Sequence, residues 1–399
     1  MIYTKHRQFN FAPDNSEARQ LLSVISETKA SPVSRSVDRP LLALYGCGNL
    51  GRMARNYLAH FGFKLSFALD LKAEQYQQDP AWQGVSVLHP DEVAPEQRNS
   101  CLLAICVVTS PCIPLIKNLQ TQGWSDCVPF YDIAEAYRDQ HPLSNGWIAA
   151  PFTAVEIQNI STVLSGWSDN LSRAHHLQFL SWRRLREEWS FTDAPVTADD
   201  RFFIPEILSI LNDHETFADF GAHTGSVAER FLKIKKGNFS RIWAIEPDQA
   251  NMENLRKKIS RMTPETRKRI QLKQTSVGSH PGASTFYYGL GYASQLSRLG
   301  QHKIKVNTID ELKLDPSYIK LHLEGAELDA LKGAQKTILR HRPIITATTY
   351  HNDLGLWELP LWLMQKIPDY HFLLRLHSWC GTGSVIYCIP NERWQNLKI

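Results

Sequence analysis

The stretch FADFGAHTGS, residues 217–226, decides the fold of the second half of the chain. A short apolar run leads through Asp219 into a pair of glycines, and a helical pattern follows. Glycine lacks a side chain, so a ligand can approach the backbone there, and the first N–H groups of a helix point at it. We therefore expect a strand, a ligand-binding turn and a helix. The residues expected to contact the ligand are Asp219, Gly221, His223 and Gly225.

A carboxylate follows at the end of the next apolar run. The sequence IWAIEPD, residues 242–248, places Glu246 about twenty residues after the glycine turn, where nucleotide-binding α/β folds carry the acidic residue that binds the ribose hydroxyls. The third run ends at Ser276 and Val277, which we expect beside the adenine of the same ligand. Turn and carboxylate together predict a nucleotide-type cofactor at the carboxyl ends of these strands.

Seven apolar runs in the second half have the length and spacing of strands. The first five alternate with helical patterns, which predicts a parallel α/β sheet, and a Gly-Thr-Gly turn at 381–383 predicts that the last two form an antiparallel hairpin. A further hairpin, Ser284 to Tyr288 with Lys303 to Thr308, is expected before the fourth strand. This layout is typical of class I methyltransferases, which use S-adenosylmethionine. The expected strands are Thr216 to Phe220, Arg241 to Ile245, Ile270 to Val277, Tyr318 to Leu323, Pro343 to Thr349, His371 to Leu376 and Ser384 to Ile389.

Candidate catalytic residues follow the fourth and fifth strands. Ligands of doubly wound sheets bind at the carboxyl ends of strands, and alternation places His322 and Glu324 on the same side of the chain. His351, after the fifth strand, is expected to face the same pocket. Imidazole titrates near neutrality, so His322 and His351 are candidates for a general base, and Glu324 would orient one of them or bind the acceptor. A hydrogen-bonded, half-buried histidine explains His322 equally well.

The segment from 216 to 390 resembles the FkbM-type methyltransferase family. The resemblance rests on FADFGAHTGS, IWAIEPD, VNTIDEL, YIKLHLEGAELDALKGA, RPIITATTYHND, YHFLLRLHS and SVIYCIP, in that order and with matching spacing. The stretch from Leu171 to Phe203 also resembles the region that precedes the domain in two-domain members. The resemblance covers rather more than half of the chain and implies a class I fold with S-adenosylmethionine as methyl donor.

Two residues depart from the pattern of that family. The family usually has Asp where this chain has His322, and commonly has an Asp near the position of Thr224. Without an Asp near Thr224, the backbone of the turn and the helix terminus would still hold the cofactor. The first departure leaves the identity of the base open. No ligand spacing requires a metal, so no metal site is predicted, and a divalent ion held by Glu324 and a histidine stays an alternative.

A second glycine turn lies in the first half of the chain. GCGNLG, residues 46–51, follows an apolar run and precedes a helical pattern, and Asp70 ends the next run. These are the contextual conditions for a dinucleotide-binding fold, so Gly46, Gly48, Gly51 and Asp70 form a candidate second nucleotide site. Its ligand would be NAD(P) or a nucleotide sugar, because the segment resembles the small Rossmann-like domains attached to some sugar-modifying enzymes. A structural or dimerising role is equally open.

Two folded domains are expected, since 399 residues exceed what one hydrophobic core usually supports. The predicted fold class is α/β, with two Rossmann-like domains joined by a helical connector, the C-terminal one a seven-stranded class I methyltransferase sheet. The expected segments are an N-terminal arm and linker at 1–38, a nucleotide-binding domain at 39–150, the connector at 151–190 and the methyltransferase domain at 191–399.

Composition excludes several classes of protein. Hydrophobic residues make up 43% and charged residues 21% of the chain, which is ordinary for soluble globular proteins. The net charge of +4 is small, and the basic run from Arg256 to Lys273 has no interleaved aromatic residue, so a solvated helix face is favoured over an RNA contact. Seven cysteines without metal spacing, and no signal peptide or membrane span, favour a cytoplasmic protein. A homo-oligomer is left open.

The predicted function is transfer of a methyl group from S-adenosylmethionine to a hydroxyl of a sugar, nucleotide sugar or other polyhydroxylated metabolite. The substrate would be a small molecule or a glycan. Three alternatives stay open. They are an NAD-dependent nucleotide-sugar oxidoreductase, an RNA methyltransferase that uses the basic run, and a cofactor-binding protein without methyl transfer activity.

Overall fold

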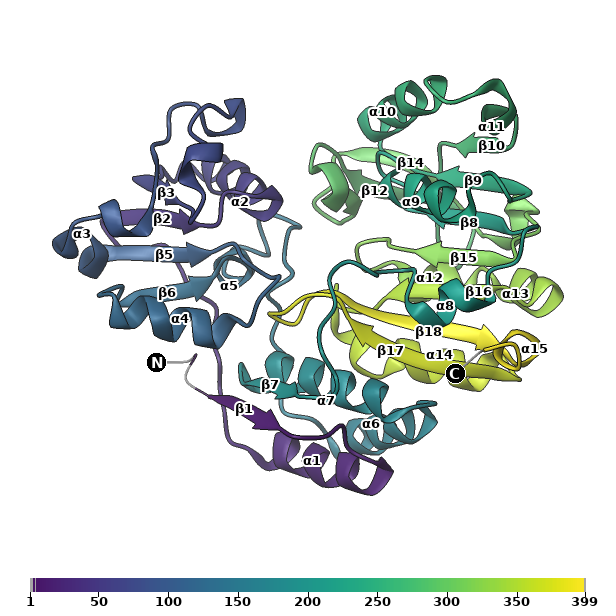
Figure 1. Cartoon of the computed structure of the whole chain (residues 1–399), viewed down its shortest axis with the longest axis horizontal. Helices are drawn as coiled ribbons and strands as arrows, with labels where there is room; N and C mark the ends of the chain where they lie inside the picture. The colour runs from purple at the N-terminus through teal and green to yellow at the C-terminus, as the bar shows by residue number, and fades with distance from the viewer. Residues whose placement is uncertain (1–2, 4, 398–399) are drawn as a thin grey trace.

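A five-stranded parallel sheet forms the first half of the chain (Figure 1). The computed structural model describes residue 3 and residues 5–397. The strand order is β4-β3-β2-β5-β6, and buried apolar side chains fill β2 and β5 at its centre, as expected for a sheet covered on both faces. The strands are β2 (Leu41–Tyr45), β3 (Phe67–Leu69), β4 (Val87–Leu88), β5 (Cys101–Ile105) and β6 (Asp126–Pro129), with helices α2 (Asn49–His60), α3 (Pro95–Ser100), α4 (Cys112–Thr121) and α5 (Phe130–Glu135).

A seven-stranded sheet forms the second half, in the order β10-β9-β8-β15-β16-β18-β17. The first five strands are parallel, and β18 runs antiparallel to both of its neighbours. The strands are β8 (Thr216–Phe220), β9 (Arg241–Ile245), β10 (Ile270–Lys273), β15 (Tyr318–Leu321), β16 (Ile344–Thr348), β17 (Tyr370–Leu376) and β18 (Ser384–Pro390). The helices are α8 (Pro205–Ile210), α9 (Ser226–Lys235), α10 (Gln249–Ser260), α11 (Pro264–Lys268), α12 (Glu327–Lys332), α13 (Gln335–His341), α14 (Glu358–Lys366) and α15 (Asn391–Trp394).

The prediction of one continuous strand from Ile270 to Val277 is wrong. β10 ends at Lys273, and β11 (Ser276–Val277) leaves the main sheet to pair with β14 (His302–Asn307). The Asn307 side-chain amide donates to Thr275 Oγ1 at 2.6 Å, which holds the bend between the two strands. The predicted hairpin is present as β12 (Gly282–Tyr287) with β14, and β13 (Gln295–Leu296) completes a small sheet. The bend brings Ser276 and Val277 to the edge of the main sheet.

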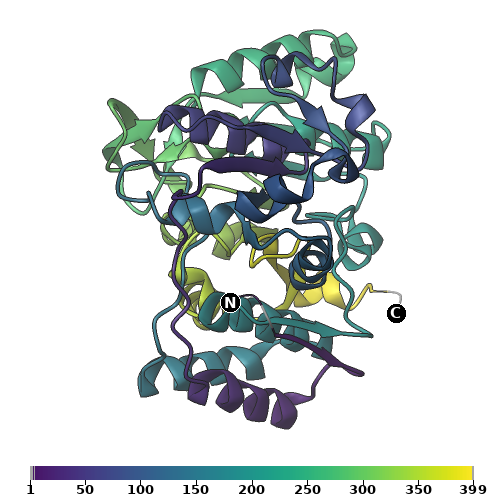
Figure 2. The ribbon, with the colours of Figure 1, turned by 90° about the vertical axis from the view of Figure 1, so that its left-hand side faces the viewer.

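The connector consists of α6 (Ala154–Gly166), α7 (Asn170–Leu185) and a strand that the sequence did not predict, β7 (Glu188–Phe191). β7 pairs in parallel with β1 (His6–Phe9), and α1 (Asn15–Glu27) packs on α6 and α7. The predicted N-terminal arm therefore forms one layer with the connector, beneath both sheets in Figure 2. The physical reason is the apolar face of α1, whose residues Ala18, Leu22 and Ile25 are buried in the same core as α7.

Arg183 of α7 ties the two halves of the chain together. Its guanidinium is buried and donates to the carbonyl oxygens of Asn145 at 2.8 Å and Trp147 at 3.1 Å, which follow the first sheet. It also donates to the carbonyl oxygens of Tyr350 at 2.9 Å and Gly381 at 2.6 Å, which follow strands of the second sheet. One side chain thus satisfies four carbonyl groups from three separate loops.

No helix among the described residues is long and apolar enough to cross a membrane. All seven cysteines are buried and unpaired.

Candidate active site

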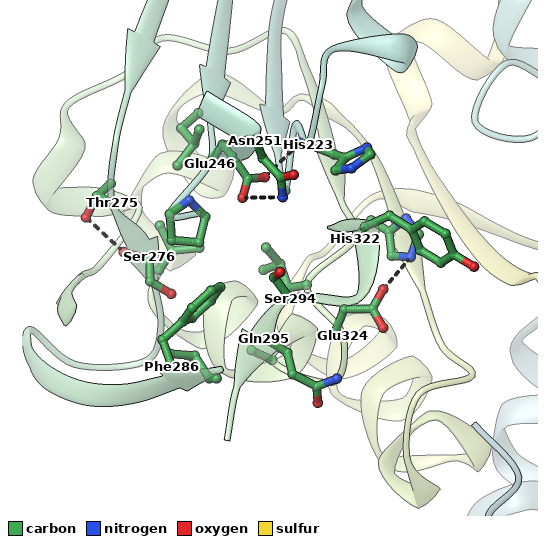
Figure 3. Close-up of a pocket in the computed structure, with 18 of the residues that line it drawn as sticks. His223, Glu246, Asn251, Thr275, Ser276, Phe286, Ser294, Gln295, His322 and Glu324 are labelled. Atoms are coloured by element: carbon green, nitrogen blue, oxygen red, sulfur yellow. Dashed lines mark hydrogen bonds and ion pairs between the residues drawn. The ribbon is translucent and has the colours of Figure 1, made fainter. Parts of the chain in front are cut away.

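A cavity lies at the carboxyl ends of β8, β9 and β15, against the small sheet (Figure 3). It holds about 620 Å³ of space free of atoms, part of which is open to solvent. The sequence-predicted residues in its wall are Gly221, His223, Glu246, Ser276, Val277, His322 and Glu324. Asp219, Gly225 and His351 lie behind this wall. The structure therefore brings five of the seven predicted cofactor residues and two of the three predicted catalytic residues to one cavity.

The glycine turn is wedged between the ends of two neighbouring strands. Gly221 N and Ala222 N both donate to the carbonyl oxygen of Ile245, each at 3.0 Å. Gly221 has a φ of +75°, and a Cβ atom there would lie 2.0 Å from the carbonyl oxygen of His322. Gly225 also has a positive φ, and a Cβ atom there would meet Leu255 at 2.5 Å. Backbone packing therefore requires glycine at position 221, and the positive φ favours glycine at position 225, independently of any ligand.

Glu246, which follows β9, holds the turn from the end of the neighbouring strand. Its Oε2 accepts the N–H of His223 at 2.7 Å, and its Oε1 accepts the N–H of Asp248 at 2.9 Å and the amide of Asn251 at 3.4 Å (Figure 3). The side chain is buried, and burial raises the pKa of the carboxyl above its usual value. A carboxylate has about four acceptor sites, so capacity is left for donors of a bound ligand.

Asp219 lies beneath the turn and has no surface in the cavity. It is fully buried and forms an ion pair with Lys320, whose Nζ lies 2.8 Å from Asp219 Oδ1. Lys320 Nζ also donates to the carbonyl oxygen of Gly221 at 2.8 Å. Burial raises the pKa of Asp219, and the neighbouring ammonium opposes this shift. The pair supports the turn from the sheet side.

His322, Glu324 and His351 form a compact cluster at the end of β15 and β16. His322 Nε2 lies 3.1 Å from Glu324 Oε1, and His351 Nδ1 lies 3.3 Å from Glu324 Oε2. Burial, with Glu327 nearby, raises the pKa of Glu324 to about 8, and burial lowers the pKa of both histidines well below their usual value. The cluster is therefore a set of largely neutral donors and acceptors in a buried place.

The reason why these side chains converge differs from the prediction. β15 ends at Leu321, so strand alternation does not extend to His322 and Glu324. Glu324 instead adopts a left-handed φ of 52°, followed by Gly325 at 106°. Glu327 fixes this turn, because its carboxylate accepts the N–H groups of Leu323 and Gly325, each at 2.9 Å. The sequence LEGAE thus encodes a rigid loop with Glu324 pointing at both imidazoles.

Several residues of the cavity wall were missed by the sequence analysis. Tyr292 stands against His223 with the ring centroids 6.2 Å apart, and Arg201 donates to the hydroxyl of Tyr350 at 2.9 Å beside the cluster. Tyr292 and Ser294 belong to the loop between β12 and β13, whose sequence YGLGYAS has no motif that could have identified it. The missed residues of the wall include Asn251, Thr275, Phe286, Tyr292, Ser294 and Gln295.

A second cavity adjoins the first between the two halves of the chain. It holds about 1290 Å³ of space free of atoms, open to solvent, and His223, Gly291 and Tyr292 belong to the walls of both cavities. α2 of the first sheet supplies one wall, with Asn49, Arg52, Met53, Asn56, Tyr57 and His60. Residues 287–292 supply the opposite wall, with two further tyrosines. A molecule in this cleft would reach the first cavity past Tyr292.

The first glycine turn has its own carboxylate but is partly covered. Asp70 Oδ2 accepts the N–H of Cys47 at 2.8 Å, and the indole N–H of Trp82 donates to the carbonyl oxygen of Cys47 at 3.2 Å. A Cβ atom on Gly51 would lie 2.0 Å from the carbonyl oxygen of Gly46. At Gly48, in contrast, a Cβ atom would meet nothing within 4 Å. Gly48 is therefore the open position of this turn.

Comparison with known proteins supports a methyltransferase. Residues 219–376 match the model of the family described as the Methyltransferase FkbM domain. The chain is similar in fold to a methyltransferase FkbM from Methylobacillus flagellatus KT, with 19% sequence identity, a TM-score of 0.59, and 95% of this chain and 94% of that chain covered. A precorrin-6y C5,15-methyltransferase from Geobacter metallireducens GS-15 aligns over 49% of this chain and 93% of its own, with 13% identity and a TM-score of 0.30. No curated protein matches the chain.

Proposed function

We propose that the protein transfers a methyl group from S-adenosylmethionine to a hydroxyl of a sugar, nucleotide sugar or other polyhydroxylated metabolite. The observation that carries the proposal is one cavity whose wall contains both the Glu246 carboxylate, beside the glycine turn, and the His322–Glu324 pair. A donor and an acceptor hydroxyl can meet there. The match to the FkbM domain over residues 219–376 supports the same reaction.

The methyl donor would lie along the turn. A ribose hydroxyl would donate to the remaining acceptor site of Glu246, and the adenine would lie beside Ser276 and Val277, which are buried at the edge of the cavity. The methionine part would then extend past Gly221 and His223 toward the end of β15. This orientation is supported by the position of the histidine cluster at that end of the cavity.

The acceptor oxygen attacks the methyl carbon of the sulfonium group. A C–O bond forms as the C–S bond breaks, which gives a methyl ether and S-adenosylhomocysteine, and the hydroxyl proton must leave. The enzyme's tasks are alignment and removal of that proton. His322, Glu324 and His351 are the proposed catalytic groups, because they lie together with His322 and Glu324 in the cavity wall, and a neutral imidazole can accept a proton.

The cleft between the two halves is the proposed acceptor site. It is lined by amide side chains at Asn49 and Asn56, the guanidinium of Arg52 and several tyrosine rings. Amides hydrogen-bond to hydroxyl groups, aromatic faces suit sugar rings or bases, and Arg binds phosphate. These properties support a polyhydroxylated acceptor, and Arg52 supports one that carries phosphate.

The first glycine turn is the proposed second nucleotide site, with Gly46, Gly48, Gly51 and Asp70 for NAD(P) or a nucleotide sugar. Its support is the open space at Gly48 and the fact that α2, which begins at Asn49, lines the cleft. A nucleotide sugar bound here could extend its sugar into the cleft.

The proposal is tested by calorimetry with S-adenosylmethionine, followed by mass spectrometry of reactions with deuterated methyl donor and a panel of sugars, nucleotide sugars and RNA. We expect one donor site and a mass increase of one labelled methyl group on a polyhydroxylated acceptor. Failure of the folded protein to bind the donor would overturn the proposal. Tight binding without turnover on any acceptor would favour a cofactor-binding protein, and methylated RNA would favour the RNA enzyme.

A further inference from the structure

Three side chains of types that can bind metal ions converge at the end of β15 and β16. His322, Glu324 and His351 each offer one donor atom, and these atoms all lie within 4.8 Å of one another. Two of the three, His322 and Glu324, also line the cavity. We propose that the three side chains bind one divalent transition-metal ion.

The separations fit ligands that share one ion. Metal–nitrogen and metal–oxygen bonds of about 2.0–2.2 Å in a tetrahedral site put neighbouring ligand atoms about 3.3 to 3.6 Å apart. His322 Nε2 and Glu324 Oε1 are 3.1 Å apart, and His351 Nδ1 and Glu324 Oε2 are 3.3 Å apart. Asn145 Oδ1, from the first half of the chain, lies 3.3 Å from His351 Nδ1 and offers a further oxygen. Because the two contacts use different oxygens of Glu324 and the three donor atoms lie within 4.8 Å of one another, the side chains would have to shift inward to share one ion.

Hydrogen bonding within the protein does not satisfy His351. Its side chain is 3% exposed, Nδ1 faces two oxygen atoms, and Nε2 has no hydrogen-bond partner. With the proton on Nδ1, the lone pair of Nε2 is buried without a donor. With the proton on Nε2, the lone pair of Nδ1 faces the oxygens of Glu324 and Asn145, and either the carboxyl proton of Glu324 or a cation can fill it. A buried lone pair without a partner is unfavourable. A cation bound to Nδ1, with the proton on Nε2, would remove that cost.

The surroundings of His351 are those of a metal ligand. A histidine that binds a metal usually directs its other N–H at a carboxylate, which fixes the ring. His351 Nε2 lies 3.8 Å from Glu327 Oε1, so a proton on Nε2 points toward that carboxylate. Glu327 is itself fixed by the hydroxyl of Thr348 at 2.6 Å and by the backbone of the LEGAE loop. Glu327 is therefore held beside the ring, just beyond hydrogen-bond distance of Nε2.

The donor set selects the class of ion. Mg²⁺ and Ca²⁺ prefer oxygen ligands, whereas two imidazoles with one carboxylate suit Zn²⁺, Fe²⁺, Co²⁺ or Ni²⁺. A site with three protein ligands keeps positions open for a further ligand. Because His322 and Glu324 line the cavity, the open positions would face it.

A catalytic role for the ion rests on the proposed methyl transfer, whereas binding of the ion does not. An acceptor hydroxyl bound to the ion would have a lowered pKa, its proton would pass to solvent water, and the alkoxide oxygen would take the methyl group as the C–S bond breaks. The histidines would then hold the ion instead of taking the proton.

The test is titration of the metal-stripped full-length protein with Co²⁺, followed by visible absorption, and with Zn²⁺, followed by calorimetry. We expect one ion per chain. His322→Asn and Glu324→Gln should each weaken binding at least about 100-fold, and Glu327→Gln about 10-fold. The exposed His280 offers the control variant His280→Asn, which should bind the ion as the wild type does.

The proposal is overturned if the folded wild-type protein binds neither ion at a single site, or if His322→Asn and Glu324→Gln bind as tightly as the control. Circular dichroism of each variant shows whether it is folded, and the wild-type measurement needs no variant. Binding of S-adenosylmethionine to the metal-free protein is measured in parallel. It tests the proposed function separately, because the donor contacts at Glu246 do not involve the ion.

Discussion

The two glycine turns of this chain have the same local construction and different surroundings. Each follows a central strand, precedes a helix, and is held by a carboxylate from the end of the next strand. Asp70 accepts the N–H of Cys47 at 2.8 Å, and Glu246 accepts the N–H of His223 at 2.7 Å. The second turn opens on a cavity, whereas Trp82 covers the carbonyl group of Cys47 in the first. The motif therefore encodes the backbone of a turn, and the surrounding chain decides what space is left in front of it.

A neighbouring helix start of the first sheet is closed as well. Glu188 of β7 is buried, and its Oε2 accepts the N–H of Cys112 at 2.6 Å and of Ile113 at 3.4 Å, at the beginning of α4. A carboxylate of the protein therefore occupies a place where an anionic ligand could otherwise bind. Four predictions test this contrast between the covered strand ends of the first sheet and the open strand ends of the second.

The largest effect is expected from a methyl group on the packed glycines. Gly221→Ala should lower the free energy of unfolding by about 4 kcal/mol, because the Cβ atom would overlap a carbonyl oxygen and the backbone has a positive φ. Gly51→Ala should lower the free energy of unfolding by about 3 kcal/mol. Its Cβ atom would also lie 2.0 Å from a carbonyl oxygen, but the backbone of Gly51 has no positive φ. Urea denaturation measures both. A loss below about 1 kcal/mol at either glycine would contradict the packing explanation.

The second prediction concerns pH and Glu188. Burial raises the pKa of this carboxyl from 4.5 to about 7, so the folded protein binds the proton more tightly than the unfolded chain. The stability that Glu188 contributes is fully present below pH 4.5 and is lost as the pH rises through about 7. The loss amounts to about 3 kcal/mol. Other buried groups titrate in the same window, so the contribution of Glu188 is the difference between two curves: urea denaturation between pH 4 and pH 8 should show that the wild type loses about 3 kcal/mol more than Glu188→Gln.

The control for that experiment is Glu265→Gln, which alters an exposed glutamate of α11. Its unfolding free energy should follow the wild type across the pH range. If Glu188→Gln also follows the wild type, Glu188 does not carry the slope, and the helix start of α4 is less closed than described.

The third prediction compares the two carboxylates that hold the turns. Glu246→Gln should raise the dissociation constant for S-adenosylmethionine about 100-fold, or about 2.7 kcal/mol, because an amide replaces one acceptor oxygen with a donor that faces the N–H groups around it. The matched variant Asp70→Asn should change that constant less than about two-fold. Calorimetry measures both. Equal losses would mean that the carboxylates act only on the stability of the fold.

The smallest effect is expected at Gly48. Its φ is −71° and no atom lies within 4 Å of a Cβ position, so Gly48→Ala should change the unfolding free energy by less than about 0.5 kcal/mol. Donor binding should also be unchanged. Calorimetry with NAD⁺ and with nucleoside diphosphates, on the wild type and this variant, tests the first turn directly. A ligand that binds the wild type and is lost in Gly48→Ala would establish a nucleotide site there, and equal binding would exclude close approach to Gly48.

The sequence predicts the main strands of the second sheet because they are continuous apolar runs. It fails at β7, because EWSF is too short to stand out from the end of a helix, and its partner β1 lies about 180 residues earlier in the chain. It also fails at Ile270 to Val277, where a tertiary contact between Asn307 and Thr275 bends the strand. Local patterns do not encode pairings over such separations.

At the candidate site, the sequence identifies residues that follow strands and misses those that depend on tertiary contacts. His322 and Glu324 were expected together, but through strand alternation and not through the left-handed turn that joins them. Asn145 and Tyr292 reach the site from the first half of the chain and from the loop between β12 and β13. Neither has a neighbouring motif, so only the folded arrangement reveals them.

The four carbonyl groups that accept hydrogen bonds from Arg183 limit how far the chain can be truncated. A fragment that begins at residue 191 would contain every strand of the second sheet, yet the carbonyl groups of Tyr350 and Gly381 would lose their buried donor. The segment that matches the family, residues 219–376, is therefore shorter than the smallest unit expected to be stable. Gene fragments designed around sequence similarity alone should yield insoluble protein, and the practical unit for expression extends through α7 to the first residues of the chain.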